Sequence, residues 1–170
     1  MDRADEPMST IREQIVAAVH TALNTERPAG IPETVRTRVE SPGPDALPVL
    51  TVYQGREVVS PKHAEKADPG RGERMAIRGD IVNRKVDVNF EVLVKAGKDD
   101  PPADQAADPY LAWAVRSIIG AGRFGGLARR PAEEQGTQFS YEQADFSYCR
   151  ATTTFRIEYQ SKTDDAEQLK

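Results

Sequence analysis

The sequence predicts an α+β protein, in which two helices pack on one face of a mostly antiparallel or mixed β-sheet. Two stretches have the apolar spacing of an amphipathic helix, and five are predicted strands, of which three alternate clearly between apolar and polar residues. The longest strand stretches have one apolar and one polar face, as expected of a sheet with helices on one side only. The predicted order is α-β-β-β-α-β-β, with a long loop before the third strand.

The composition limits the class of protein. The 170 residues, 38% of them hydrophobic, suit one domain with one core. The 27 acidic and 23 basic residues leave a net charge of -4, whereas a domain that binds duplex DNA over a broad face is usually basic. Cys149 is the only cysteine, which excludes an internal disulfide and a multi-cysteine zinc site. No apolar run approaches the ~20 residues of a membrane span, and residues 1–9 lack the apolar region of a secretory signal.

The first predicted element is a helix over residues 10–23, preceded by a flexible N-terminus over residues 1–9. Thr10 and Glu13 have the spacing of a capping box, in which each side chain bonds a free backbone N–H of the other residue. Apolar residues follow at helical spacing: Ile11, Ile15, Val19, Ala22 and Leu23. Asn24 and Pro28 end the helix, which we expect to lie on the sheet.

The next two elements are predicted strands over residues 34–40 and 47–54, joined by a turn over residues 41–45. The first strand alternates, with Val35, Thr37 and Val39 on one face and Arg36, Arg38 and Glu40 on the other. Pro48 indicates that the second strand begins there or lies at an edge. Residues 55–73 have no periodicity and are expected to form a long loop.

The last three strands are predicted over residues 84–95, 137–142 and 148–160, and residues 75–82 continue the first of these or pair beside it. The inward residues of the two long strands are Val86, Val88, Phe90, Val92, Val94, Cys149, Ala151, Thr153, Phe155, Ile157 and Tyr159. The single domain spans residues 10–160, and the polar tail over residues 161–170 is expected to be flexible.

The second helix is predicted over residues 108–119, after a polar loop over residues 98–108. Asp108 takes the N-cap and Pro109 the first helical position, where its missing N–H costs nothing. Gly120 ends the helix and begins a segment that matches GxGxxG, Gly120–Gly125. In dinucleotide-binding proteins that pattern follows a strand and opens a helix, whereas here it follows a helix. We therefore predict a helix C-cap and a loop, and no cofactor.

Two loops of opposite charge are the candidate contact surfaces. Arg116, Arg123, Arg129 and Arg130 surround the loop after the second helix, with no acidic residue between them. Residues 98–108 hold one lysine and four aspartates. The arginines indicate either an acidic partner or a solvated helix end, and the sequence leaves both open. The opposite signs lead to the hypothesis that copies of the chain meet head to tail.

No group of residues has the pattern of a catalytic or metal site, so we expect no enzyme. His20 and His63 have no carboxylate or cysteine at ligand spacing, and Cys149 is predicted to be a buried, inert thiol. Asp99 and Asp100 are adjacent in a loop, where solvation explains them. The outward faces of the strands are predicted to carry both signs of charge, which suits subunit contacts or solvent. These charged residues are Arg36, Arg38, Arg84, Asp87, Glu91, Arg156 and Glu158.

Several segments, in order, resemble the tail terminator (tail completion) proteins of long-tailed bacteriophages. The resemblance covers about residues 11–159, and residues 55–73 and 120–130 match nothing in it. The matching segments are the helix Ile11–Leu23, the strand Val35-Arg-Thr-Arg-Val39, the LPxxxVY-like segment Leu47-Pro48-Val-Leu-Thr-Val-Tyr53, the strand that begins Arg84-Lys-Val-Asp-Val, the helix Asp108–Ile119 and the closing strand Ala151–Tyr159 with its xFxxxY pattern.

The resemblance implies an α+β subunit that forms a six-membered ring, a homohexamer, on the end of the tail tube. Such a ring ends tube polymerisation and offers a surface to head-completion or connector proteins. The implied location is the head-proximal end of the virion tail, and the host cytoplasm during assembly. DNA would pass through the lumen only as cargo, where acidic residues limit sticking by repulsion. We predict that Asp99, Asp100 or Asp104 faces that lumen.

Two other functions stay open from the sequence. Another head–tail joining protein, such as a stopper or adaptor, has the same size and the same lack of a catalytic set. Binding to tail tube ends or to the portal side distinguishes the two. The third possibility is a small nucleic-acid-binding protein that uses the arginine loop, and the net charge of -4 disfavours it. Most of the aromatic residues (five Phe, five Tyr, one Trp) are also at positions expected to face the core, where they cannot stack on bases.

Overall fold

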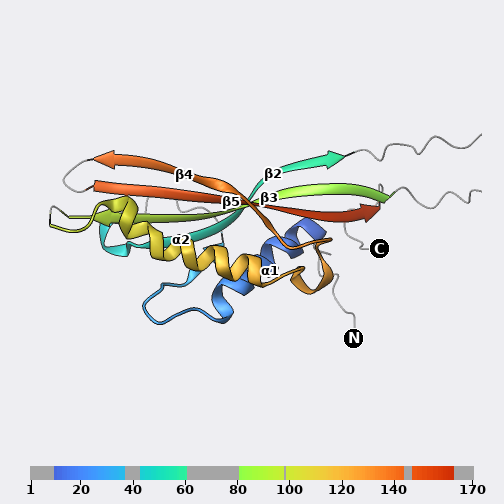
Figure 1. Ribbon diagram of the computed structural model, residues 1–170, viewed down its shortest axis with the longest axis horizontal. Coiled ribbons are helices and arrows are strands. Elements are labelled where there is room, and N and C mark those ends of the chain that lie inside the picture. Colours follow the sequence, from blue (N-terminus) through green and yellow to red (C-terminus); the bar gives the residue numbers. More distant parts are fainter. Residues whose placement is uncertain (1–9, 37–42, 61–80, 98, 144–146, 163–170) are drawn as a thin grey trace, which may run out of the picture.

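The computed structural model describes residues 10–36, 43–60, 81–97, 99–143 and 147–162. They form helices and strands in the predicted order (Figure 1). The elements are α1 (Ile11–Thr25), β1 (Thr34–Arg36), the 3₁₀ turn η1 (Pro44–Ala46), β2 (Val49–Ser60), β3 (Ile81–Ala96), α2 (Ala103–Gly120), the 3₁₀ turn η2 (Phe124–Gly126), β4 (Glu133–Gln143) and β5 (Ser147–Lys162).

The five strands form one mixed sheet in the order β1-β2-β3-β5-β4. β1 runs parallel to β2, and the three other pairs are antiparallel. The central pair is β3 and β5, which stay in register from Ile81 opposite Lys162 to Ala96 opposite Ser147. Figure 1 shows a strongly twisted sheet with α1 and α2 on the same side. The predicted α+β class, with two helices on one face of a mixed sheet, is confirmed.

The core lies between the two helices and the sheet face that they cover, called here the covered face. The inward residues predicted for the two long strands are all buried. In the predicted stripe of α1, Ala22 is half-buried and the other four residues are buried. The aromatic centre of the core is Phe90, whose ring meets that of Trp113 edge to face at 6.1 Å. Burial of each large apolar side chain contributes roughly 1.5–3 kcal/mol, so this layer is the main stabilising feature of the fold.

The N-terminus of α1 confirms half of the predicted capping box. The Oγ1 of Thr10 accepts a hydrogen bond from the backbone N–H of Glu13 at 3.2 Å. The Glu13 carboxylate pairs instead with Arg36, at 2.7 Å, and so links α1 to β1.

The predicted start of the second helix is wrong by five residues. α2 begins at Ala103, so Pro109 lies inside the helix, and Asp108 is not its N-cap. The apolar stripe already includes Ala103 and Ala107, both buried against the core. Pro109 and Gln105 face solvent, so the Gln105 carbonyl that loses its helical donor is open to water. The predicted end of the helix at Gly120 is confirmed.

The predicted inward face of the first strand is also wrong within the described residues. Thr34 is buried and Val35 is 40% exposed. Thr34 takes the buried position because its backbone is hydrogen-bonded to α1. Asn24 accepts a hydrogen bond from the Thr34 N–H and donates one to the Thr34 carbonyl, each at 3.0 Å. Thr37, Arg38, Val39 and Glu40 lie outside the described residues.

Three other strands are longer than predicted. β2 continues through a bulge to Ser60, where the sequence indicated a loop from Gly55 onward. β4 begins at Glu133, and β5 includes Ser161, which is buried although it was assigned to a flexible tail. Pairing with a long neighbouring strand stabilises these polar segments. The apolar–polar alternation within one strand gives no information about such pairing, so the sequence did not predict the extensions. The predicted N-terminus over residues 1–9, residues 163–170 of the tail predicted over residues 161–170, and most of the long loop lie outside the described residues.

Candidate functional site

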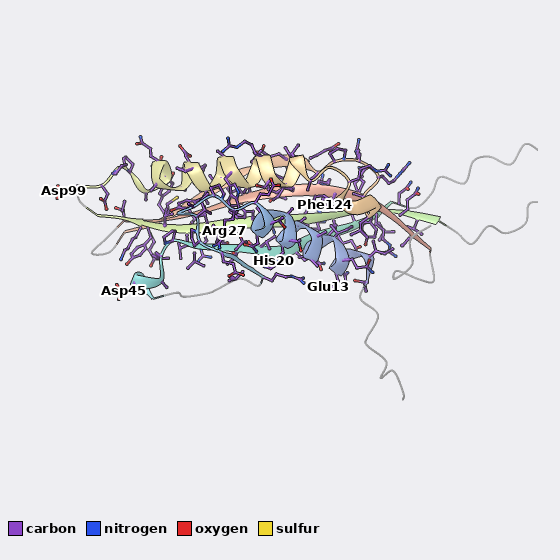
Figure 2. The ribbon with its side chains drawn as sticks, turned by 90° about the horizontal axis from the view of Figure 1, so that it is seen from below. Glu13, His20, Arg27, Asp45, Asp99 and Phe124 are labelled. Carbon is purple, nitrogen blue, oxygen red and sulfur yellow. The ribbon has the colours of Figure 1, made fainter. Side chains whose placement is uncertain are left out.

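The charged residues singled out in the sequence lie around the two ends of α2. Asp99, Asp100 and Asp104 are in the turn before the helix and in its first turn. Arg116 lies in the last turns of the helix, and Arg123, Arg129 and Arg130 follow it. Figure 2 shows Asp99 at one end of the elongated molecule and Phe124, inside the arginine loop, toward the other. The 18 residues of α2 span about 27 Å. Each sign of charge also matches the helix dipole, which favours anions at the N-terminus and cations at the C-terminus.

The three predicted lumen acids have different local roles. Asp100 accepts a hydrogen bond from the Gly97 N–H at 2.7 Å and so holds the turn before α2. Asp99 is exposed beside it, and Asp104 is half-buried in the first turn of the helix. A lumen exists only in an assembly, so their orientation toward one stays a prediction.

A small cleft lies beside these acidic residues. It has a volume of about 250 Å³. Its lining combines polar and apolar groups: Leu47, Pro48, Val94, Lys95, Gly97, Asp100, Ala106 and Tyr110. The Asp100 carboxylate at its rim is already bonded to Gly97, which favours a structural role for this acid.

The structure separates the four predicted arginines into two pairs. Arg130 bonds Glu133 at 3.1 Å and Glu158 at 2.9 Å, and Arg129 bonds the Asn83 side chain at 3.2 Å. These two side chains fasten the loop to the sheet. The Lys85 and Arg130 side chains together lower the pKa of Glu158, with the Lys85 hydrogen bond as the larger cause.

Arg116 and Arg123 are the pair that remains open to a partner. Each donates from Nε to a carbonyl of its own segment, at 3.3 Å to Ala112 and at 2.9 Å to Ala128. Within the described ranges, no carboxylate lies at ion-pair distance from either guanidinium. Both side chains are exposed, so these two arginines fit the predicted contact role better than Arg129 and Arg130.

The sheet face without helices, called here the open face, carries the predicted mixture of charges in internal pairs. Arg156 holds Asp87 through two hydrogen bonds of 2.9 and 3.1 Å, and Lys85 lies 2.8 Å from Glu158. Arg150 bonds Glu91, which is only 3% exposed. Because acids and bases alternate across β3 and β5, the open face has no field of one sign, as a polyanion-binding surface would need.

Arg84 was assigned to the outward face, and this assignment is wrong. Val86, two residues further along β3, and Tyr159, opposite Arg84 on β5, are both buried on the covered face. Arg84 therefore lies on the covered face as well. The alternation of the sequence contained this signal, since Arg84 is two residues before Val86. There Arg84 donates to the Ser161 hydroxyl at 2.8 Å and lies 3.8 Å from Glu57.

Glu57 is the centre of a polar cluster that the sequence did not reveal. Its carboxylate bonds Arg12 of α1 at 3.0 Å and accepts a hydrogen bond from the Tyr159 hydroxyl. Burial, followed by the bond to Glu57, raises the pKa of Tyr159 well above its ordinary value. The cluster (Glu57, Arg12, Arg84, Tyr159) joins α1 to three strands, and it is structural because every charge in it has a partner.

The predicted inert residues have structural surroundings. The Nε2 of His20 donates to the Thr34 carbonyl at 2.9 Å, beside the Asn24 side chain. Cys149 is fully buried, and burial raises its pKa, with Asp104 and Asp108 adding to the effect. Among the residues that the structure describes, no group of His, Cys, Asp and Glu side chains has the arrangement of a metal site, and no helix has the length and apolar character of a membrane span. His63 lies outside the described residues.

Two exposed aromatic residues on β4 were not anticipated. Phe139 is 42% and Tyr141 62% exposed, and their rings stack at 6.4 Å. They lie on the covered face, since their partners in β5 are Ala151 and Cys149, both buried.

No family model matches the sequence of this chain, and no curated protein matches it.

Proposed function

We propose that this protein is a non-enzymatic virion component that forms a ring on the end of a phage tail tube. The ring ends tube polymerisation and offers an attachment surface to head-completion or connector proteins. The proposal comes from the resemblance of the segments between residues 11 and 159, and the two-helix α+β fold is compatible with it. Its partners are other copies of the chain, the tail tube protein and a head-completion protein, with DNA as passing cargo.

The observation that carries the proposal is the separation of charge along α2. Asp99 and Asp100 lie at one end of the helix, and Arg116 and Arg123 lie near the other end with no carboxylate at ion-pair distance among the described residues. A subunit with opposite charges at its two ends is complementary to another copy or to a partner of the same polarity. A ring needs such a heterologous contact, because an identical patch on both subunits would close as a dimer.

The first test of the proposal is the mass of the purified chain over a range of concentrations, followed by negative-stain imaging. Rings are the expected result, and tail tubes added to the protein should then stop growing and show a cap at one end. A protein that binds portal complexes instead of tubes would move the function to a stopper or adaptor. A monomer that ignores both would overturn the proposal.

The nucleic-acid-binding alternative predicts that the protein shifts the mobility of duplex DNA, and that added salt weakens this shift. The same protein preparation tests it at near-physiological ionic strength.

A further inference from the structure

Two strands have an edge with no strand beside it in the described part of the chain. β4 is the last strand of the sheet and pairs only with β5. On the opposite side, β1 covers β2 only from Leu50 to Val52, and β2 continues to Ser60. Folded proteins protect such edges with charges, prolines or bulges, because unpaired backbone N–H and C=O groups bind other strands.

The β4 edge, defined as Thr137–Tyr141, has no such protection. Glu133, Glu134 and a bulge precede it, but the five residues themselves include no charge, proline or glycine. Its two aromatic rings are exposed and stack with an interplanar angle of 14°. An uncharged strand edge with exposed, stacked aromatic side chains is typical of a surface that another strand joins.

The β2 edge, defined as Gln54–Ser60, also exposes an apolar side chain. Val59 is 47% exposed, and its partner in β3 is Arg84 on the covered face. Val59 therefore lies on the same face of the sheet as Phe139. Water-exposed apolar groups on matching faces at both edges are complementary to each other when copies lie side by side.

The strand directions fit the same arrangement. β2 and β5 run one way, and β3 and β4 run the other. When a second copy lies beside β4 with its helices on the same side, its β2 edge is antiparallel to β4. An antiparallel register that places Phe139 beside Val59 of the next copy places Ser140 beside Val58 and Glu142 beside Arg56. Glu142 and Arg56 are exposed and opposite in charge.

We propose that copies of this chain join edge to edge, with the β4 edge of one copy added to the β2 edge of the next. The sheet then continues from copy to copy, and the occupant of each edge is a second copy of the same chain. The inference rests on the proposed function only for the closure of this contact into a ring. The contact is heterologous, so it leaves one free edge at each end of an assembly until the assembly closes.

The first experiment places a lysine at each edge in turn. Phe139→Lys and Val59→Lys should each weaken self-association of the full chain by about tenfold or more, measured by sedimentation velocity. Ile119→Lys is the matched control, because Ile119 is 40% exposed on α2 and belongs to neither edge. A mixture of the two edge variants should form one-to-one dimers and nothing larger, since each supplies one intact edge.

The second experiment tests the register by oxidative cross-linking. Directly opposed residues in antiparallel strands have Cα atoms about 4.5–5.5 Å apart, within the range that a disulfide spans. The double variant Val58→Cys with Ser140→Cys should form a ladder of cross-linked multimers, whereas Ser140→Cys alone should not cross-link. Cys149 is fully buried and should contribute no background.

The outcomes separate the edge contact from the proposed function. Rings that survive both lysine variants and do not cross-link would overturn the edge contact and leave the ring in place. Cross-linked dimers of Ser140→Cys alone, with no effect of Val59→Lys, would show two β4 edges pairing with each other and would also overturn it. A chain that never self-associates, with or without tail tubes, would contradict the edge contact and the proposed function together.

Discussion

At the residue scale, the most informative group is Glu57 with its three partners on the covered face. A carboxylate with 16% exposure costs free energy to desolvate, and it is retained here because Arg12, Arg84 and Tyr159 all bind it. The three partners come from α1, β3 and β5. The cluster therefore defines how the N-terminal helix is placed on the sheet, in addition to the non-directional apolar contacts of the core.

Removal of the Glu57 carboxylate should destabilise the protein. We expect Glu57→Ala to lower the free energy of unfolding by about 3 kcal/mol, because two arginines are left without their acid in a partly buried site. Glu57→Gln should cost less, since its amide oxygen still accepts from Tyr159. Urea unfolding measures both. Glu134→Ala, at an exposed position of β4, is the control and should change stability by less than about 0.5 kcal/mol. Equal values for the alanine variants would show that the cluster does not stabilise the fold.

Cys149 should be unreactive in the folded protein. Burial and the nearby Asp104 and Asp108 carboxylates raise the pKa of its thiol, which disfavours the thiolate that reacts with disulfide reagents. We expect slow labelling of the native chain and rapid labelling of one thiol in urea. A raised native pKa stabilises the fold below the ordinary thiol pKa, and this contribution is lost as the pH rises through the native value. Cys149→Ala should therefore lose stability less steeply on the alkaline side, and rapid native labelling would contradict the assignment.

At the element scale, β1 depends on a side chain of α1. The strand has three residues, too few to be stable through pairing with β2 alone. Asn24 satisfies both backbone groups of Thr34, and His20 adds a bond to the same carbonyl. The Asn24 side chain thus takes the place of a strand neighbour, which β1 lacks on this side among the described residues.

Loss of the Asn24 amide should release β1. Asn24→Ala removes the side-chain partner of the buried Thr34 N–H and leaves the Thr34 carbonyl with His20 alone, so we expect a loss of about 2 kcal/mol and faster amide exchange at Thr34 and Val35. The matched control is Thr25→Ala, one residue further along α1, where the exposed hydroxyl bonds only the Thr21 carbonyl. Unchanged exchange at β1 in Asn24→Ala would overturn this role.

The proline inside α2 is a second feature at this scale. Pro109 removes one helical hydrogen bond from the longest helix, at a position where both it and Gln105 face solvent. Pro109→Ala should stabilise the protein by roughly 1 kcal/mol, since the helix gain of up to ~3 kcal/mol is partly offset by greater freedom of the unfolded chain. Thermal unfolding measures the change. Ala112→Gly, at an exposed position of the same helix, should instead destabilise by about 1 kcal/mol. A destabilised Pro109→Ala would indicate that the proline shapes the turn before the helix.

At the scale of the whole molecule, two kinds of contact are expected between copies, and they differ in their response to salt. Contacts between exposed charges at the two ends of α2 weaken as ionic strength rises. Edge contacts between β4 and β2 depend mainly on backbone hydrogen bonds and apolar burial, which salt does not screen, and only the exposed Glu142–Arg56 pair adds a salt-sensitive part. A titration with salt therefore separates the two contributions in one preparation.

Reversal of one charge at the arginine loop should remove the salt-sensitive part of self-association. We expect Arg123→Glu to weaken association by about tenfold at low ionic strength, and to have little effect at high ionic strength. Arg27→Glu is the matched control, because both arginines are exposed and both bond a local backbone carbonyl. Mixing Arg123→Glu with Asp99→Lys should restore association. Equal losses in Arg123→Glu and Arg27→Glu would contradict a specific contact.

The sequence by itself determined the class of fold and the content of the core. The inward positions of β3 and β5 and the stripe of α1 follow from periods of two and 3.6 residues, which reflect burial within a single element. The same local rules located the end of α2 at Gly120 and identified Cys149 as a buried thiol. These features do not depend on which elements become neighbours.

Only the tertiary structure decided the features that depend on neighbours. The extension of β2 to Ser60, the burial of Thr34 and the start of α2 at Ala103 all rest on pairing or packing with distant segments. The same holds for the division of the four arginines, of which Arg129 and Arg130 bond the sheet and Arg116 and Arg123 do not pair with it. Charge at a position is a property of the sequence, but whether that charge is free to bind a partner depends on the groups that folding brings beside it.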